Sequence, residues 1–190
     1  MVSNTREKNH FVLETGRLVC EPLTSKHSSK VYVNWMNDPA VIKFMLSGGN
    51  YTIDLLNEYL LKIENKNIYA WAIKLKSNKK HIGNIKIDPI NYKHLFGEFG
   101  IMIGDKNEWG KGYARESSQT IINFCFNNLG LKKINLGLFS KHDQAFNLYK
   151  KIGFNTEKIK KNYFKTENGC FDLIRMSLNK IQFDNNFLKN

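Results

Sequence analysis

The stretch "GEFGIMIGDKNEWGKGYARES", from Gly97 to Ser117, decides the fold. It begins as an apolar strand, continues as a polar loop in which two glycines flank a lysine, and ends at the start of a helix. Glycines at such a junction let backbone N–H groups approach a bulky anion, and the N-terminus of the following helix adds the positive end of its dipole. The stretch therefore predicts an anion-binding turn between a strand and a helix.

Two familiar phosphate-binding motifs do not fit this loop. A P-loop requires Gly, four residues and then Gly-Lys-Ser/Thr, whereas five residues separate Gly104 from Gly110, and Gly112 stands where the hydroxyl would bind magnesium. A dinucleotide fingerprint requires G-x-G-x-x-G, and Arg115 occupies the place of its third glycine. A tight strand-to-helix turn without a ligand is the plain alternative.

The composition indicates a globular chain with an excess of basic side chains. Its 190 residues are 42% hydrophobic and carry a net charge of +12, which favours anionic partners. Lysine, asparagine and isoleucine are abundant together, however, which favours a general compositional bias. The basic runs at 74–81 and 158–165 are expected to be solvated strand ends and turns. Because neither a basic helix nor a nucleic-acid module is recognisable, we do not expect nucleic acid as a partner.

The cysteines and the start of the chain indicate a reducing compartment. Cys20, Cys125 and Cys170 are far apart and odd in number, which argues against a disulfide framework. The start "MVSNTREKNH" is too polar for a signal peptide, and no apolar run approaches the ~20 residues that span a bilayer. We therefore expect a cytoplasmic protein without a membrane partner.

The periodicity of apolar residues predicts a mixed α+β fold in a single domain at 11–179, between polar ends at 1–10 and 180–190. Apolar runs predict strands at 16–23, 68–75, 81–87, 97–104, 133–139 and 170–178. Helical spacing predicts helices around 31–36, 53–64, 114–128 and 143–154. The last helix has Asp143 as its expected N-cap and Gly153 as its C-terminal stop.

The order of strand, "WGKGYA", amphipathic helix, strand and "NLYKKIGF" resembles the GNAT acetyltransferase superfamily. The stretches "ETGRLVCEPLT" and "NWMNDPAV" are similar to the branch that holds ribosomal-protein N-terminal and spermidine acetyltransferases. The resemblance covers about 12–178. It implies a central, mostly antiparallel, twisted sheet that is flanked by helices and splayed at the acetyl-coenzyme A site.

The resemblance also implies which residues hold acetyl-coenzyme A. The family binds the pyrophosphate on the loop Q/R-x-x-G-x-G/A, and Trp109 stands at the position of Gln or Arg. The remaining loop positions are Gly110, Lys111, Gly112, Tyr113 and Ala114. Three strand residues contribute backbone groups, for the pantetheine arm at Ile101 and Ile103 and for the oxyanion at Met102. Two positions near the last helix complete the set, namely His142, where relatives have Asn, and Ala145.

Two residues are expected to take part in proton transfer. Glu98 lies in the strand immediately before the loop and resembles the family's general base, although an exposed glutamate on an alternating strand would look the same. Tyr149 shares an apolar helix face, which on pattern alone makes it a core aromatic. The resemblance instead makes it the acid that protonates the departing thiolate. The five histidines have no metal-ligand spacing, so we expect no metal.

These expectations define an N-acetyltransferase that moves an acetyl group to a primary amine directly, in a ternary complex. The acceptor, a small molecule or a peptide, is expected to be a nucleotide-linked amino sugar. A ribosomal-protein N-terminus or a polyamine is the alternative, and the net charge disfavours a polycation. A non-catalytic, basic nucleic-acid-binding module is the rival of another class. An open sheet edge would permit a homodimer.

Overall fold

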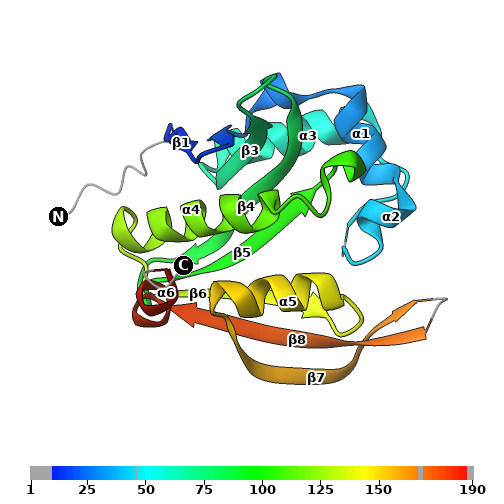
Figure 1. Cartoon of the computed structure of the whole chain (residues 1–190). Coiled ribbons are helices and arrows are strands. Elements are labelled where there is room, and N and C mark those ends of the chain that lie inside the picture. The colour runs from blue at the N-terminus through cyan, green and yellow to red at the C-terminus, as the bar shows by residue number, and fades with distance from the viewer. Residues whose placement is uncertain (1–9, 46, 167–168, 188–190) are drawn as a thin grey trace. The chain divides into compact units, whose positions relative to one another are not determined.

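The protein's structure, a computed structural model, describes residues 10–45, 47–166 and 169–187. The strands in these ranges are β1 Leu13–Glu14, β2 Leu18–Pro22, β3 Tyr69–Leu75, β4 His81–Asn91, β5 Phe96–Ile103, β6 Lys133–Phe139, β7 Asn155–Thr166 and β8 Gly169–Asn179 (Figure 1). The helices are α1 Lys30–Asn37, α2 Pro39–Ile42, α3 Ile53–Asn65, α4 Tyr113–Asn127, α5 Asp143–Ile152 and α6 Lys180–Phe187, with the 3-10 turns η1 Ser25–His27 and η2 Lys106–Glu108. The α+β class is therefore confirmed.

The strands hydrogen-bond in the order β1-β2-β3-β4-β5-β6-β8-β7. The defined registers are antiparallel except for β5 and β6, which pair in parallel from Phe96 with Lys133 to Glu98 with Asn135. The sheet is thus mostly antiparallel, as expected. Contacts divide the described chain into two compact units. The first holds the residues up to Asp88 together with 100–120, and the second holds 89–99 together with the residues from 121 onward.

The first unit packs α1 and α3 on β3 through one apolar cluster. Its buried members are Leu23, Tyr32, Trp35, Met36, Leu56, Leu60, Ile63, Ala70 and Ala72. Side-chain caps begin each of the two helices, because Ser29 accepts a hydrogen bond from the Tyr32 N–H and Thr52 accepts one from the Leu55 N–H, both at 3.2 Å. Met102 of β5 packs against this cluster, which places a predicted site residue beside the unit's core.

The second unit packs one face of its strands against buried helical side chains. Ile134, Leu136 and Leu138 of β6 are buried, as are Met176 and Leu178 of β8 and Tyr149 and Ile152 of α5. Helix α5 ends where Gly153 adopts a left-handed conformation at φ +114°, which glycine permits without a steric penalty. This stop agrees with the prediction. The predicted cap is wrong, because His142 holds the N-cap position and Asp143 is the first helical residue, where its charge still complements the helix dipole.

Two further segments differ from expectation. The basic run at 158–165 lies within the long strand β7, which pairs with β8 at the end of the strand order; lysines are common on such edges because they discourage further pairing. The C-terminal segment is not a loose polar end in its described part, because α6 buries Phe183 against Phe126 with 5.6 Å between ring centres. The N-terminal residues 1–9 lie outside the described residues.

Candidate functional site

The predicted glycine loop turns sharply and leads directly into α4. Gly110 and Gly112 have φ angles of +76° and +84°, a region that other residues adopt only at a cost. The hydrogen-bond ladder of α4 begins when the Glu116 N–H donates to the Gly112 carbonyl at 3.1 Å. The three preceding N–H groups, of Tyr113, Ala114 and Arg115, therefore lie ahead of the first helical bond. Such a helix start suits an anion.

Trp109, the residue at the family's Gln or Arg position, connects the loop to β5 by a hydrogen bond. Its indole Nε1 donates a hydrogen bond to the carbonyl oxygen of Ile103 at 2.7 Å, while 41% of the residue stays exposed. A tryptophan has only this one donor. Trp109 therefore fixes where the loop leaves β5. It also occupies the Ile103 carbonyl, a backbone group that was expected to bind the pantetheine arm.

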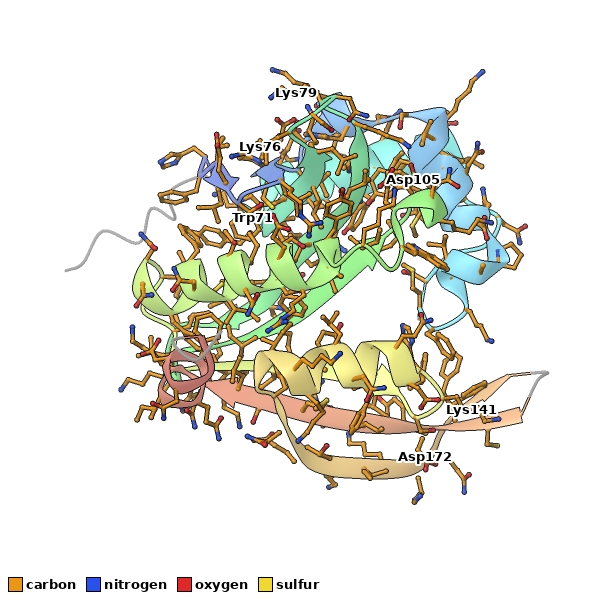
Figure 2. The ribbon with its side chains drawn as sticks, viewed as in Figure 1. Trp71, Lys76, Lys79, Asp105, Lys141 and Asp172 are labelled. Carbon is orange, nitrogen blue, oxygen red and sulfur yellow. The ribbon has the colours of Figure 1, made fainter. Side chains whose placement is uncertain are left out.

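The lysines at the loop are paired with carboxylates. Lys111 Nζ lies 2.8 Å from Glu108 Oε2, so a carboxylate offsets its positive charge. Lys80 bridges Asp105 at 2.5 Å and Glu108 at 3.7 Å; Asp105 is labelled in Figure 2. Burial by itself raises the pKa of Asp105, but Lys80 and the Asn107 N–H hold it below its usual value. The charges of Lys80 and Lys111 are therefore offset by carboxylates next to the loop.

The end of β5 is held close to β4 and α1. The N–H groups of Gly104 and Asp105 both donate to the Ile82 carbonyl, at 2.9 and 3.1 Å. A Cβ on Gly104 would come within 2.2 Å of the Trp35 ring, so only glycine lets the indole lie there. These contacts fix where β5 stops and the loop begins.

Glu98, the predicted base, pairs with an arginine that sequence reasoning did not identify. Arg175 Nη2 lies 2.6 Å and 2.9 Å from the two carboxylate oxygens of Glu98. Gly137, the register partner of Arg175, leaves room for its side chain. Asn135, the register partner of Glu98, has a buried amide oxygen without a hydrogen-bond partner, which is available to accept a bond from an N–H group.

Tyr149 is buried among aromatic rings. Its ring centre lies 6.1 Å from that of Phe99 and 5.7 Å from that of Phe154, both edge-on. Burial raises its pKa to about 12. Neighbouring strand residues point to opposite faces, so Glu98 and the Phe99–Tyr149 contact lie on opposite faces of β5. With its pKa at about 12, the Tyr149 phenol is protonated at neutral pH.

The remaining predicted residues lie at the N-cap of α5 and within this helix. His142 begins α5, and its carbonyl accepts a bond from the Phe146 N–H at 3.0 Å; Ala145 lies one turn before Tyr149. The structure thus places the loop residues with Ile101, Met102 and Ile103 in the first unit, and Glu98, His142, Ala145 and Tyr149 in the second. Arg175 was missed, although a single arginine inside the apolar run "CFDLIRMSL" was a usable signal.

Within the described ranges, no group of three or more His, Cys, Asp and Glu side chains is placed to hold a metal ion. No helix within the same ranges is long and apolar enough to cross a membrane.

Comparisons with known proteins show the family of this chain. The family model for the acetyltransferase (GNAT) domain matches residues 17–155. An uncharacterised N-acetyltransferase of Bacillus subtilis, YoaA, is 24% identical over 164 residues, which are 85% of this chain and 92% of that protein. The spermidine N(1)-acetyltransferase of Vibrio cholerae is 28% identical over 124 residues, which are 65% of this chain and 71% of that protein.

Solved structures share the fold. The crystal structure of spermidine N-acetyltransferase from Vibrio cholerae in complex with CoA and spermine has a TM-score of 0.81 at 24% sequence identity, covering 89% of this chain and 99% of that one. A GNAT-family acetyltransferase from Bacillus anthracis has a TM-score of 0.78 at 18% identity, covering 89% of this chain and 98% of that one. At these identities the likeness concerns the fold.

Proposed function

Since the chain belongs to the GNAT acetyltransferase family and is therefore an N-acetyltransferase, we propose that it moves an acetyl group from acetyl-coenzyme A directly to a primary amine. The single observation that carries the cofactor assignment is the start of α4. There, two glycines in left-handed conformations precede three N–H groups that lie ahead of the helical ladder. This arrangement suits a pyrophosphate without any metal.

The residues on and around β5 have the properties that acetyl transfer requires. An amine with a pKa of ~10.4 must lose a proton before it attacks the thioester carbonyl. The new oxyanion requires a pre-aimed donor, for which we assign the Met102 N–H. As the carbon–sulfur bond breaks, we assign the Tyr149 phenol, which is protonated at neutral pH, as the group that gives a proton to the thiolate.

We assign Glu98 as the base that takes the proton of the amine, directly or through water. Its pairing with Arg175 leaves this role open, because a carboxylate has about four lone-pair positions and Arg175 engages each oxygen once. We expect Glu98→Gln to lower turnover and to shift the pH–rate profile upward. Glu157→Gln is the matched control, since Glu157 is another ion-paired glutamate. A Glu98→Gln profile that coincides with that of wild type would remove Glu98 from the mechanism.

The acceptor is proposed at the level of chemical class, as a small-molecule or peptide primary amine. The Vibrio cholerae proteins described above are named for spermidine, which makes a polyamine the first acceptor to test. The net charge of +12 opposes the approach of a polycation, so a nucleotide-linked amino sugar and a ribosomal-protein N-terminus complete the panel. Turnover with one class and not with the others identifies the acceptor.

The thermal midpoint in the presence of ligands tests the cofactor assignment. We expect acetyl-coenzyme A to raise the midpoint while ATP and NAD do not, because a ligand at about 100 times its Kd adds about 2.7 kcal/mol of stability. An RNA oligomer represents the rival function as a basic nucleic-acid-binding module. A shift with RNA that disappears as salt increases, together with no shift from acetyl-coenzyme A, would contradict the proposal.

A further inference from the structure

Arg17, which precedes β2, contacts the glycine loop and α4 although it is 94 residues from the loop in sequence. Its Nη1 donates a hydrogen bond to the Lys111 carbonyl at 3.0 Å, and its guanidinium carbon lies 4.5 Å from the centre of the Tyr113 ring. The side chain also runs past Gly112, where an added Cβ would lie 3.4 Å from Nη2. One side chain thus contacts Lys111 and Tyr113 and lies beside Gly112 between them.

The same guanidinium neutralises a carboxylate in the first turn of α4. Glu116 Oε2 lies 2.7 Å from Arg17 Nε and 2.6 Å from Nη2. Its other oxygen accepts bonds from the Arg17 N–H at 2.9 Å and from the Thr15 hydroxyl at 2.5 Å. Burial by itself raises the pKa of Glu116, but these bonds from Thr15 and Arg17 hold it below its usual value, so the carboxylate is charged at neutral pH.

A charged glutamate at this position affects the anion site in two opposite ways. A negative charge in the first turn of a helix stabilises the helix, because it faces the positive end of the dipole. The same charge repels an anion at the N–H groups of that turn. Arg17 places two guanidinium nitrogens on Glu116 Oε2, so its positive charge offsets the repulsion while the carboxylate stays in place. The loop's lysines do not replace it, since Lys80 and Lys111 are paired with Asp105 and Glu108.

We propose that Arg17 is a positioning residue for acetyl-coenzyme A, which neutralises Glu116 at the pyrophosphate loop. This inference rests on the proposed function. Arg17 acts through Glu116. Removing its charge should therefore weaken cofactor binding while the chemical step is preserved.

The test compares KM for acetyl-coenzyme A with kcat in Arg17→Gln, Arg17→Lys and Arg17→Gln/Glu116→Gln. We expect Arg17→Gln to raise KM about fivefold, the effect of one charge at a helix N-terminus, with kcat unchanged. Arg17→Lys keeps the charge and should lie between Arg17→Gln and wild type. The double variant should return to within about twofold of wild type, because the repelling carboxylate is gone. Lys161→Gln, which breaks the exposed Lys161–Asp172 pair, is the control for the loss of one positive charge.

Each result has a defined meaning. If Arg17→Gln lowers the thermal midpoint and leaves KM at the wild-type value, or if the double variant is as impaired as Arg17→Gln, Arg17 is merely structural and the inference is overturned. If the Arg17 variants do not fold, Glu116→Gln alone decides: a lower KM supports the inference and an unchanged KM overturns it. A wild-type protein that does not bind coenzyme A in calorimetry overturns the proposed function itself, and with it the inference.

Discussion

At the scale of single residues, the choice between arginine and lysine is informative in this chain. Only four of the 29 basic residues are arginines, and two of them, Arg17 and Arg175, each hold a glutamate through two close contacts. A guanidinium presents a planar fork that an ammonium group cannot imitate. In a composition this rich in lysine, an arginine therefore marks a place where geometry matters as well as charge.

Tyr149 allows a sharp test at this scale. We expect Tyr149→Phe to lose about 100-fold in kcat, in the range typical of general acid catalysis, while its thermal midpoint stays near that of wild type. With a pKa of about 12, the phenol should also cause no alkaline loss of wild-type activity below roughly pH 11.

The control for Tyr149→Phe is Tyr163→Phe, because Tyr163 is half-exposed on β7 and has no assigned role. A steady-state assay with acetyl-coenzyme A and the chosen amine measures kcat for both variants. Wild-type kcat in Tyr149→Phe would make Tyr149 a core aromatic, as its helix-face pattern alone suggests.

At the scale of elements, glycine sets how closely β4 approaches β5. A Cβ on Gly83 would lie 2.2 Å from the Met102 carbonyl oxygen and 2.9 Å from the Ile103 Cα. Both contacts are with backbone, so no side chain can rotate away to relieve them. The position of the proposed oxyanion donor on β5 therefore depends on the absence of a side chain on β4.

Substitution of Gly83 tests this dependence. We expect Gly83→Ala to destabilise the protein by about 2–3 kcal/mol through overpacking, and to lower kcat in whatever fraction still folds, because Met102 must move. Gly100→Ala on β5 is the matched stability control, since its added Cβ would make only ordinary 3.8 Å contacts with Lys86. Urea unfolding measures both. Equal stability of Gly83→Ala and wild type would mean that the two strands can separate there at little cost.

At the scale of the whole molecule, the net charge of +12 is not concentrated on the loop. Three basic groups of the loop region pair with carboxylates, in Lys80–Asp105, Lys111–Glu108 and Arg17–Glu116. Other lysines lie on β7, the last strand in the order, where charge discourages edge-to-edge association. The lysines on β7 thus have a structural explanation that needs no nucleic-acid partner.

Local sequence determined the features that depend on local backbone conformation. Gly110 and Gly112 occupy the left-handed conformations that the loop requires, β6 has the predicted bounds, and Gly153 ends α5 as predicted. In each case the steric freedom of a few neighbouring residues, or their apolar alternation, is enough to select the conformation. The loop motif and the family resemblance followed from the same short segments.

Tertiary structure alone decided which distant side chains meet. Arg17 meets Glu116 across 99 residues and Arg175 meets Glu98 across 77, and neither pairing follows from periodicity. The sequence did not predict strand β7 or the burial of Phe183 for the same reason. The lysine-rich strand is stabilised by pairing with β8, and the polar helix α6 is stabilised by packing of Phe183 on Phe126. Such contacts depend on strand order and register, which are properties of the folded sheet. The anion-binding turn is thus encoded locally, whereas the charges that surround it are placed by the fold.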